Sequence, residues 1–260
     1  MKEKLTIVKV GGKIVEDAAS LSALIERFAR IEGHKLLVHG GGRTATDIAA
    51  QMGIATTMVG GRRVTDADML RIVTMVYGGL VNKNIVAQLE ASGICALGLT
   101  GADMDIIRAH RRTGTATDYG FVGDVDSVDH ERLARTILSG TVPVLAPLTH
   151  DGRGTMLNTN ADTIASETAR ALSHEFRVTL IYCFEHAGVL SNPEDAESVI
   201  KTICRTDFER LVADGTVSGG MVPKLENCLA AVEAGVDRIV ITRADLIDGV
   251  GGTVIVKGRF

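Results

Sequence analysis

A lysine at the end of an apolar strand is the first feature of this 260-residue sequence that suggests chemistry. Residues 6–10, TIVKV, predict a buried strand that contains Lys9 near its end, and Gly11 and Gly12 follow the strand at once. A buried ammonium group without a partner costs free energy. Lys9 is therefore expected either to extend into solvent or to meet an anion at the end of the strand.

Glycine-rich turns supply other groups that could bind an anion. We predict that three of them end strands and lead toward helices: Gly11-Gly12, Gly40-Gly41-Gly42 and Gly219-Gly220. Backbone N–H groups in such turns, together with the N-terminus of a helix, bind phosphates and other anions. Lys9 and Lys224 lie close to two of these turns, and Arg63 lies in another turn before a helix. The set favours a ligand with phosphates and carboxylates; ordinary tight turns are the alternative.

The stretch LNTNADTIA, residues 157–165, places three polar side chains at alternate positions. Asn160 could cap a helix, and Asp162 would then lie in the first turn, where an acidic group is favourable. Capping does not explain Asn158, which precedes both residues. These three polar groups are therefore a candidate ligand site.

Lys224 lies in the first turn of the helix that the stretch GGMVPKLENC predicts. The helix macrodipole opposes a cation at this end, whereas Pro near a helix start is ordinary. A phosphate bound at the same N-terminus would make the cation favourable. An exposed lysine without a ligand is the alternative interpretation.

Composition and missing motifs exclude several classes of function. The formal net charge of -4 and the pI near 6.0 give no reason to expect nucleic acid or a membrane surface as a partner. No G-x-x-x-x-G-K-[ST] or G-x-S-x-G motif is present, and no G-x-G-x-x-G follows a predicted strand. The seven histidines and four cysteines show no metal-ligand spacing, so no protein-held metal site is predicted.

The sequence also predicts where the protein works. No apolar run reaches the roughly 18 residues that a membrane span needs. The first residues lead directly into a strand, without a signal peptide. We therefore expect a cytoplasmic protein whose cysteines are reduced thiols, most of them packed in the core.

Strands and helices alternate along the chain. The predicted strands cover residues 6–10, 35–39, 95–99, 142–146, 178–183, 238–242 and 252–256. The predicted helices cover residues 21–31, 43–53, 66–92, 129–138, 159–172, 207–213 and 221–234, and residues 104–127 predict an excursion of one or two hairpins. This alternation predicts an α/β fold with a mainly parallel sheet and helices on both faces. Ligands bind such sheets beyond the carboxyl ends of the strands.

The helix predicted at residues 66–92 is too long and too apolar for a simple surface helix. Ile72, Val76, Leu80 and Val86 belong to its apolar side, and the pair Gly78-Gly79 could bend it. Two interpretations remain, a central core helix and part of a subunit interface.

Six stretches of the sequence are similar to the motifs of one protein family. They are VKVGGKI, VHGGGRTATD, GRRVTDADML, LNTNADTIA, SGGMVPKLENC and the closing GGTVIV, in the family's order over nearly the whole chain. On these residues the chain resembles the amino acid kinase family, and within it the branch that acts on acylated glutamate. The resemblance implies a three-layer α/β/α sandwich with one continuous sheet. It also implies an N-terminal lobe, residues 1–175, for the acylglutamate and dimer contacts, and a C-terminal lobe, residues 176–260, for ATP.

The resemblance further implies transfer of the γ-phosphoryl group of MgATP to the side-chain carboxylate of N-acetyl-L-glutamate, a step of arginine biosynthesis. Mg²⁺ would be held mainly by the nucleotide phosphates. The matching positions would be Lys9 and Lys224 as transition-state cations, Asp162 to orient them, and Gly41, Gly42, Arg63 and Asn158 for the acylglutamate. Positions for the phosphoryl group and the nucleotide would be Gly11, Gly12, Gly41, Glu185, Gly188, Gly219 and Gly220.

The chemistry of this reaction suits these residue types. A glutamate γ-carboxylate, with a pKa of about 4.3, is ionised at neutral pH and needs no general base. The difficulty is to bring it against a phosphate of like charge, which positioned cations and N–H groups overcome. Lys9 is then expected to meet the phosphoryl group.

Two departures from the family affect these expectations. Relatives commonly carry Asp where Glu185 stands, in a loop that touches the nucleotide. The chain also begins at its first strand, without the N-terminal helix of arginine-inhibited hexameric relatives. We therefore expect a homodimer without that form of feedback.

Two alternative functions remain open. N-succinyl-L-glutamate as substrate would need a cation for its distal carboxylate, which Arg108, Arg111 or Arg112 could supply; a solvated basic edge is the other interpretation of these arginines. A non-catalytic sensor of an amino acid or nucleotide could use the same fold. The two lysines and the aspartate named above argue against a sensor, since a binder does not need transition-state cations.

Overall fold

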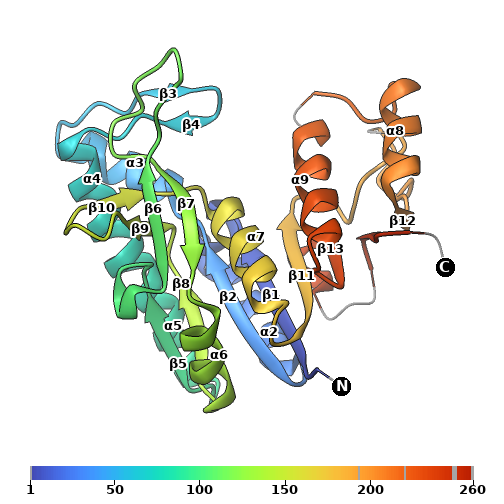
Figure 1. Ribbon diagram of the computed structural model, residues 1–260, viewed down its shortest axis with the longest axis horizontal. Helices are drawn as coiled ribbons and strands as arrows, with labels where there is room; N and C mark the ends of the chain where they lie inside the picture. The colour runs from blue at the N-terminus through green and yellow to red at the C-terminus, as the bar shows by residue number, and fades with distance from the viewer. Residues whose placement is uncertain (1, 193, 220, 248–250, 259–260) are drawn as a thin grey trace.

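The computed structural model describes residues 2–192, 194–219, 221–247 and 251–258, and its centre is an eight-stranded sheet (Figure 1). The strands are β1 (Lys4–Val10), β2 (His34–His39), β5 (Ala96–Leu99), β8 (Val142–Leu145), β11 (Arg177–Phe184), β12 (Thr202–Ile203), β13 (Arg238–Arg243) and β14 (Thr253–Ile255). They lie in the order β12-β14-β13-β11-β1-β2-β8-β5. Neighbouring strands run parallel except β13 and β14, so the prediction of a mainly parallel sheet is confirmed.

Helices cover both faces of this sheet. One face carries α6 (His130–Leu138), α7 (Ala161–Leu172), α8 (Arg205–Ala213) and α9 (Met221–Glu233). The other carries α1 (Gly12–Glu16), α2 (Ala18–Arg30), α3 (Gly42–Gln51), α4 (Ala67–Val73) and α5 (Asn82–Ala91). Alternate strand residues point to opposite faces, so Leu5 and Ile7 pack with the first set of helices and Val8 and Val10 with the second. The predicted three-layer arrangement is confirmed.

The sheet is continuous across the boundary that the sequence predicts near residues 173–177. The chain passes there from α7 to β11, and β11 pairs with β1 along its length, from Lys4 opposite Arg177 to Lys9 opposite Tyr182. On its other side β1 pairs with β2 in parallel. The carboxyl ends of the three strands therefore lie together, at the upper edge in Figure 1.

The helical stretch predicted at residues 66–92 is a single run interrupted by a π-helical segment. This segment, η1 (Thr74–Val81), joins α4 to α5 and contains Gly78 and Gly79. Val76 and Tyr77 are buried, whereas Met75 and Leu80 are exposed. The run is therefore a core helix on one side and offers apolar side chains to solvent on the other.

Smaller sheets lie beyond the carboxyl ends of the central strands. The excursion forms one hairpin, β6 (Ile107–Arg111) and β7 (Gly123–Val128), in a four-stranded sheet with β9 (Leu148–His150) and β10 (Met156–Asn158). A two-stranded hairpin of β3 (Met58–Val59) and β4 (Arg62–Arg63) was not predicted. Gly60 and Gly61 form its turn with φ of 55° and 75°, where glycine is favoured. Two short 3₁₀ helices, η2 (Asp103–Asp105) and η3 (Ala244–Leu246), complete the described elements.

One predicted position of a glycine turn is wrong. Gly219 does not end a strand; it lies between α8 and α9, with φ of 55°. Gly220, its predicted partner, lies outside the described residues. Among the described residues, no helix has the length and apolar character needed to cross a lipid bilayer.

Candidate active site

Lys9 finds an anionic partner on a helix of the adjacent layer. Its side chain shares the sheet face of Leu5 and Ile7, the face that α7 covers, because strand residues alternate. Its Nζ atom lies 2.6 Å from Oδ1 of Asp162. The side chain of Lys9 is 11% exposed and that of Asp162 is 40% exposed, so the carboxylate is the more accessible partner of the pair. The ion pair balances a charge that would otherwise be costly to bury.

The start of α7 holds Asp162 in place. Asn160 caps the helix and accepts hydrogen bonds from the N–H groups of Asp162 at 2.7 Å and Thr163 at 3.3 Å. The hydroxyl of Tyr182 donates to the carbonyl of Asp162 at 3.2 Å. Burial raises the pKa of Tyr182 above its ordinary value, so the hydroxyl remains a donor. The predicted capping by Asn160 and first-turn position of Asp162 are confirmed.

Lys224 lies near this pair, in the first turn of α9. Its Nζ atom lies 4.6 Å from the centre of the Phe184 ring, a cation–π contact. Lys224 and Asp162 line one cavity of about 440 Å³ between α7 and α9, here called the α7–α9 cavity. The fold thus brings Lys9 to Asp162, and brings Lys224 to a cavity that Asp162 also lines, although the three residues are far apart in the sequence.

The first two glycine turns lie against each other. A Cβ atom at Gly12 would lie 3.6 Å from the nitrogen of Gly42 and 3.7 Å from that of Gly41. A Cβ atom at Gly40 would lie only 3.2 Å from the nitrogen of Gly12. Gly11 is the N-cap of α1 and Gly41 the N-cap of α3, so two helix N-termini meet here. This is the arrangement of N–H groups that binds anions.

A small cavity beside these turns contains the predicted Arg63 and Asn158. This hairpin cavity has a volume of about 210 Å³ and lies between the glycine turn, the β3–β4 hairpin and β10. Nη2 of Arg63 donates to the Gly42 carbonyl at 2.6 Å and to Thr46 Oγ1 at 2.8 Å. Nδ2 of Asn158 donates to Thr65 Oγ1 at 2.9 Å. Both side chains are therefore held by their neighbours before any ligand arrives.

The ring of Tyr77 forms another wall of the hairpin cavity. A Cβ atom at Gly41, whose φ is 156°, would lie 3.1 Å from Cδ1 of Tyr77, so the ring packs directly on the glycine turn. Burial raises the pKa of Tyr77, although the charge of Arg63 opposes this shift. Tyr77 was not singled out from the sequence, because its position in a long apolar helix gives no sign of function.

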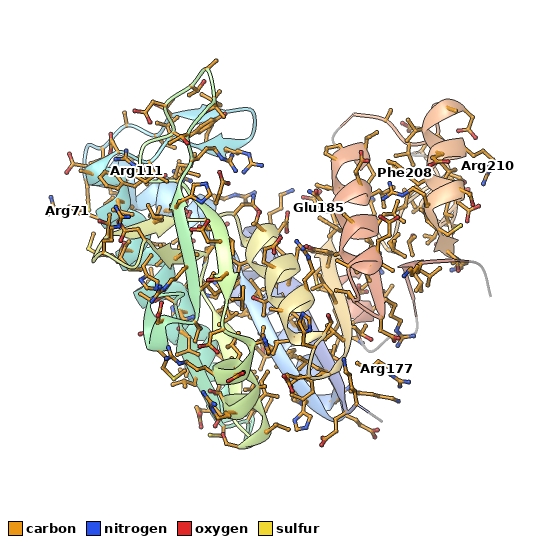
Figure 2. The ribbon with its side chains drawn as sticks, viewed as in Figure 1. Arg71, Arg111, Arg177, Glu185, Phe208 and Arg210 are labelled. Carbon is orange, nitrogen blue, oxygen red and sulfur yellow. The ribbon has the colours of Figure 1, made fainter. Side chains whose placement is uncertain are left out.

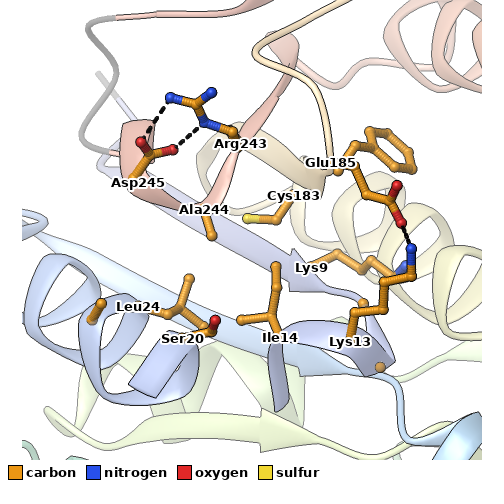
Figure 3. Close-up of a pocket in the computed structure, with 14 residues that line it drawn as sticks. Lys9, Lys13, Ile14, Ser20, Leu24, Cys183, Glu185, Arg243, Ala244 and Asp245 are labelled. Carbon is orange, nitrogen blue, oxygen red and sulfur yellow. Dashed lines mark hydrogen bonds and ion pairs between the residues drawn. The ribbon is translucent and has the colours of Figure 1, made fainter. Parts of the chain in front are cut away.

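A third cavity lies on the other side of Lys9. It has a volume of about 610 Å³ between α1, α2 and the ends of β11 and β13, and is here called the α2–β13 cavity (Figure 3). Apolar side chains line its floor, among them Ile14, Leu24 and Cys183. Gly11 and Gly12 lie at one end and a paired Arg243 and Asp245 at the other. An apolar cavity that ends in a glycine turn and a lysine suits a ligand with a flat body and an anionic end.

Glu185 lies at the mouth of this cavity and pairs with Lys13 of α1 (Figure 3). In the view of Figure 2 it lies between α7 and α9. Lys13 lowers the pKa of Glu185, so the carboxylate is charged. Both side chains are mostly exposed, at 59% for Lys13 and 64% for Glu185. Lys13 was missed in the sequence, although its place directly after Gly11-Gly12 was a usable signal.

Gly188 lies away from the cavities described above. A Cβ atom there would lie 2.6 Å from Val199 Cγ1 and 2.7 Å from Thr253 Oγ1. Close packing therefore explains this glycine without a ligand. The α7–α9 cavity adjoins the other two: Phe184 lines it and the α2–β13 cavity, and Asn160 lines it and the hairpin cavity.

No reactive thiolate or metal cluster is found beside these cavities in the described part of the chain. Burial raises the pKa values of Cys183 and Cys228 to about 12, so both thiols stay protonated at neutral pH. The described residues contain no group of three His, Cys, Asp or Glu side chains placed to hold a metal ion. Cations and N–H groups, rather than a protein nucleophile, are the chemical resources of the site.

Comparison with known sequences agrees with this geometry. The profile of the amino acid kinase family matches residues 4–243. The acetylglutamate kinase of Bacteroides fragilis is 63% identical over 257 residues, which cover 99% of this chain and 98% of that protein. The acetylglutamate kinase of Methanopyrus kandleri is 40% identical over 96% of this chain and 100% of its own length.

Solved structures show the same architecture. The protein smu.665 from Streptococcus mutans UA159 has a TM-score of 0.79 at 26% identity and covers 98% of this chain and 99% of its own. The N-acetylglutamate synthase of Neisseria gonorrhoeae, complexed with coenzyme A and N-acetyl-glutamate, has a TM-score of 0.82 over 99% of this chain and 60% of its own. At 20% identity the second likeness concerns the fold alone. The match to the family profile and the identities over nearly full length show that this chain belongs to the amino acid kinase family.

Proposed function

We propose that this chain transfers the γ-phosphoryl group of MgATP to the γ-carboxylate of N-acetyl-L-glutamate, giving N-acetyl-L-glutamyl 5-phosphate for arginine biosynthesis. The observation that carries the proposal is the ion pair of Lys9 with Asp162. It joins the α2–β13 cavity, which Lys9 lines, to the α7–α9 cavity, which Asp162 and Lys224 line. Relatives named acetylglutamate kinase, 63% identical over nearly the whole chain, support the choice of substrate.

The reaction places an ionised carboxylate against a phosphate of like charge, so positioning and charge stabilisation dominate. We assign the acylglutamate to the hairpin cavity, with Arg63, Asn158 and the N–H groups of Gly41 and Gly42 as its contacts. The carboxylate oxygen attacks the γ-phosphorus, and the bond to the β-phosphate oxygen breaks. Cations on either side of the transferring group stabilise the charge that develops there.

Lys9 and Lys224 are these cations. Lys9 pairs with Asp162 and lines the same cavity as Gly11 and Gly12, and Lys224 lines the α7–α9 cavity together with Asp162. Asp162 orients Lys9 and reduces the repulsion between the two ammonium groups. Gly11 and Gly12 add N–H groups toward the phosphoryl group, at the N-terminus of α1.

ATP is assigned to the α2–β13 cavity, which leads from Lys9 to the apolar floor. Glu185 and Lys13 stand at its mouth, and Lys13 is free to exchange its carboxylate partner for a phosphate because both groups are largely exposed. Gly219 precedes α9, the helix that carries Lys224, and is not among the described residues that line the α2–β13 cavity. Mg²⁺ is assigned to the nucleotide phosphates, because Asp162 and Glu185 are already paired with lysines.

The acetyl group is favoured over the succinyl group by the state of the three arginines. Arg108 donates to Asp105 at 2.7 and 2.6 Å, and Arg112 forms a similar fork with Asp124. Arg111 donates to a main-chain carbonyl. None of them is among the described residues that line the hairpin cavity. Each of these three arginines would have to give up its present hydrogen bonds to reach a distal carboxylate.

A homodimer in the cytoplasm completes the proposal. Met75 and Leu80 of η1 are 52% and 47% exposed, and Leu97 on the edge strand β5 is 40% exposed. Exposed apolar side chains that form a patch favour a protein interface. The four cysteines are free thiols, which suits a reducing compartment. The N-terminal lobe, residues 1–175, would carry the acylglutamate and these contacts. The C-terminal lobe, residues 176–260, would share ATP with it, because both lobes line the α2–β13 cavity.

The test is ADP release from MgATP with N-acetyl-L-glutamate, N-succinyl-L-glutamate and L-glutamate in parallel assays. Hydroxylamine trapping of an acyl phosphate identifies the product. We expect rapid turnover with the acetyl compound alone. Preference for the succinyl compound would refute the substrate assignment, and binding without turnover of any acid would favour the sensor.

A further inference from the structure

A buried histidine and a buried asparagine lie beneath the glycine turn that leads into α3. His39 is the last residue of β2 and is fully buried, and Asn82, the first residue of α5, is 1% exposed. The described linings of the three cavities contain neither side chain. His39 lies on the sheet face of Leu37, opposite the face on which Lys9 meets Asp162. The proposed reaction therefore leaves this pair without a role.

The hydrogen bonds of the pair determine which nitrogen of the histidine carries the proton. Nδ2 of Asn82 donates to the Val144 carbonyl at 2.9 Å, which identifies this atom as the amide nitrogen. The same Nδ2 lies 3.1 Å from Nε2 of His39, so Nε2 accepts and the ring proton is on Nδ1. Nδ1 then donates to the Gly40 carbonyl at 2.7 Å. Burial lowers the pKa of His39 to about 4, which keeps the ring neutral.

The edge strand β5 leaves space for the side-chain amide of Asn82. A Cβ atom at Gly98 of β5 would lie 1.8 Å from Oδ1 of Asn82, so the strand has room for the amide only because residue 98 is glycine. Oδ1 itself has no hydrogen-bond partner among the described residues. A buried polar atom without a partner costs free energy. Replacing both partners of such a pair by apolar side chains of similar shape can be neutral or stabilising, so stability alone does not explain the pair.

The carbonyl that His39 holds belongs to the peptide that presents the Gly41 N–H. In a trans peptide the C=O and N–H groups point in opposite directions. Holding the carbonyl toward His39 therefore turns the Gly41 N–H away from the core, toward Gly12, whose Cβ position would lie 3.7 Å from it. Gly41 is the N-cap of α3, and its N–H has no acceptor within the helix. A peptide between two glycines has few steric restraints of its own.

We propose that His39, held by Asn82, is a positioning residue that keeps the Gly41 N–H directed at the reacting carboxylate and phosphoryl group. If the Gly40–Gly41 peptide turned over, it would present a carbonyl oxygen to two anions. The histidine prevents this because its Nδ1–H donates to the Gly40 carbonyl, and its ring accepts no hydrogen bond from the turn. This inference rests on the function proposed above.

Two substitutions of nearly equal size separate positioning from packing. In His39→Asn the side-chain amide can place its nitrogen close to the position of Nδ1, and in His39→Gln close to that of Nε2. Only the asparagine can donate to the Gly40 carbonyl. We expect His39→Gln to lower kcat by about 10²-fold, the loss of one positioned N–H donor, with the KM for ATP nearly unchanged. His39→Asn should recover about tenfold of that loss.

Thermal unfolding of both variants shows whether a less stable fold causes the loss of kcat. A loss of kcat that is equal in both variants and follows a fall in melting temperature would overturn the proposal. A kcat that differs between them at similar melting temperatures supports it. An Asn82→Leu variant, which keeps the histidine but removes the donor that selects its tautomer, should also lower kcat without raising the KM for ATP.

Nitrogen NMR of the ¹⁵N-histidine-labelled protein at pH 7.5 tests the same idea without any substrate. We expect a neutral His39 ring with its proton on Nδ1. A proton on Nε2, or a doubly protonated ring, would overturn the proposal. This measurement stands even if the assays above identify a different acid as substrate, so the two proposals fail separately.

Discussion

The ammonium of Lys9 and the carboxylate of Asp162 form an ion pair of 2.6 Å that links the central sheet to the first turn of α7. Lys9 comes from the residues before the first glycine turn, and Asp162 enters from more than half the chain away. The pair leaves Asp162 with 40% of its side chain exposed toward the cavities. Lys9 is thus held at the place where negative charge develops in the proposed reaction.

Replacing Lys9 by alanine should lower kcat by about 10²-fold or more, the cost of removing one electrostatic donor. The KM for N-acetyl-L-glutamate should change little, because Arg63 and Asn158 remain in place. Steady-state kinetics with both substrates measures this. Lys201→Ala, which removes an exposed lysine far along the chain, is the control. Near-normal turnover of Lys9→Ala would refute its role.

Replacing Lys13 by alanine should raise the KM for ATP by about 3- to 10-fold, the loss of one partly exposed charge contact at about 1 kcal/mol. Its present partner, Glu185, is also exposed, so the free energy of unfolding should stay nearly constant. Glu185→Gln releases Lys13 and should leave the KM for ATP unchanged or lower it. If Glu185→Gln raises that KM as much as Lys13→Ala does, the glutamate itself contacts the nucleotide.

Arg63→Lys should raise the KM for N-acetyl-L-glutamate by about tenfold, since a lysine cannot keep the planar fork. The guanidinium now donates to both the Gly42 carbonyl and Thr46 Oγ1. The KM for ATP should not change. Arg71→Lys, on the exposed surface of α4 with 78% of the side chain accessible, provides the matched control and should behave as the unmodified chain. Equal effects in the two variants would contradict the assignment.

The buried, neutral state of His39 should make the free energy of unfolding fall in weak acid. Its pKa is lowered from 6.5 to about 4 in the folded chain, so the unfolded chain binds more protons between these values. Stability is fully present above the ordinary pKa and falls as the pH drops toward 4. Urea unfolding at pH 7.5 and pH 5 should show a contribution of about 2 kcal/mol from this residue.

Other groups titrate in the same range, so the measured quantity is the difference between the unmodified chain and His39→Asn. The variant should lose this part of the pH dependence. An identical pH dependence in both proteins would show that the ring is not held neutral by burial.

The sequence determined the layers of the fold and the local structure at the start of α7. Alternating apolar strands and amphipathic helices can pack only as helices on both faces of a parallel sheet. The cap at Asn160 and the first-turn position of Asp162 also follow from local hydrogen bonding and the helix dipole. Short strands such as β3 and β4, two residues each, left no period to detect. The packing of Gly188 against Val199 and Thr253 had no local signal either.

Only the tertiary structure decided which distant groups meet. The sequence predicted that Lys9 could meet an anion. The pairing of β1 with β11 and the packing of α7 on that face of the sheet place Asp162 beside it. The exchangeable pair of Lys13 and Glu185 and the buried contact of His39 with Asn82 arose in the same way. Local patterns fix secondary structure through short-range sterics and hydrogen bonds. Partners separated by tens of residues depend on strand order and helix packing, which only the assembled core specifies.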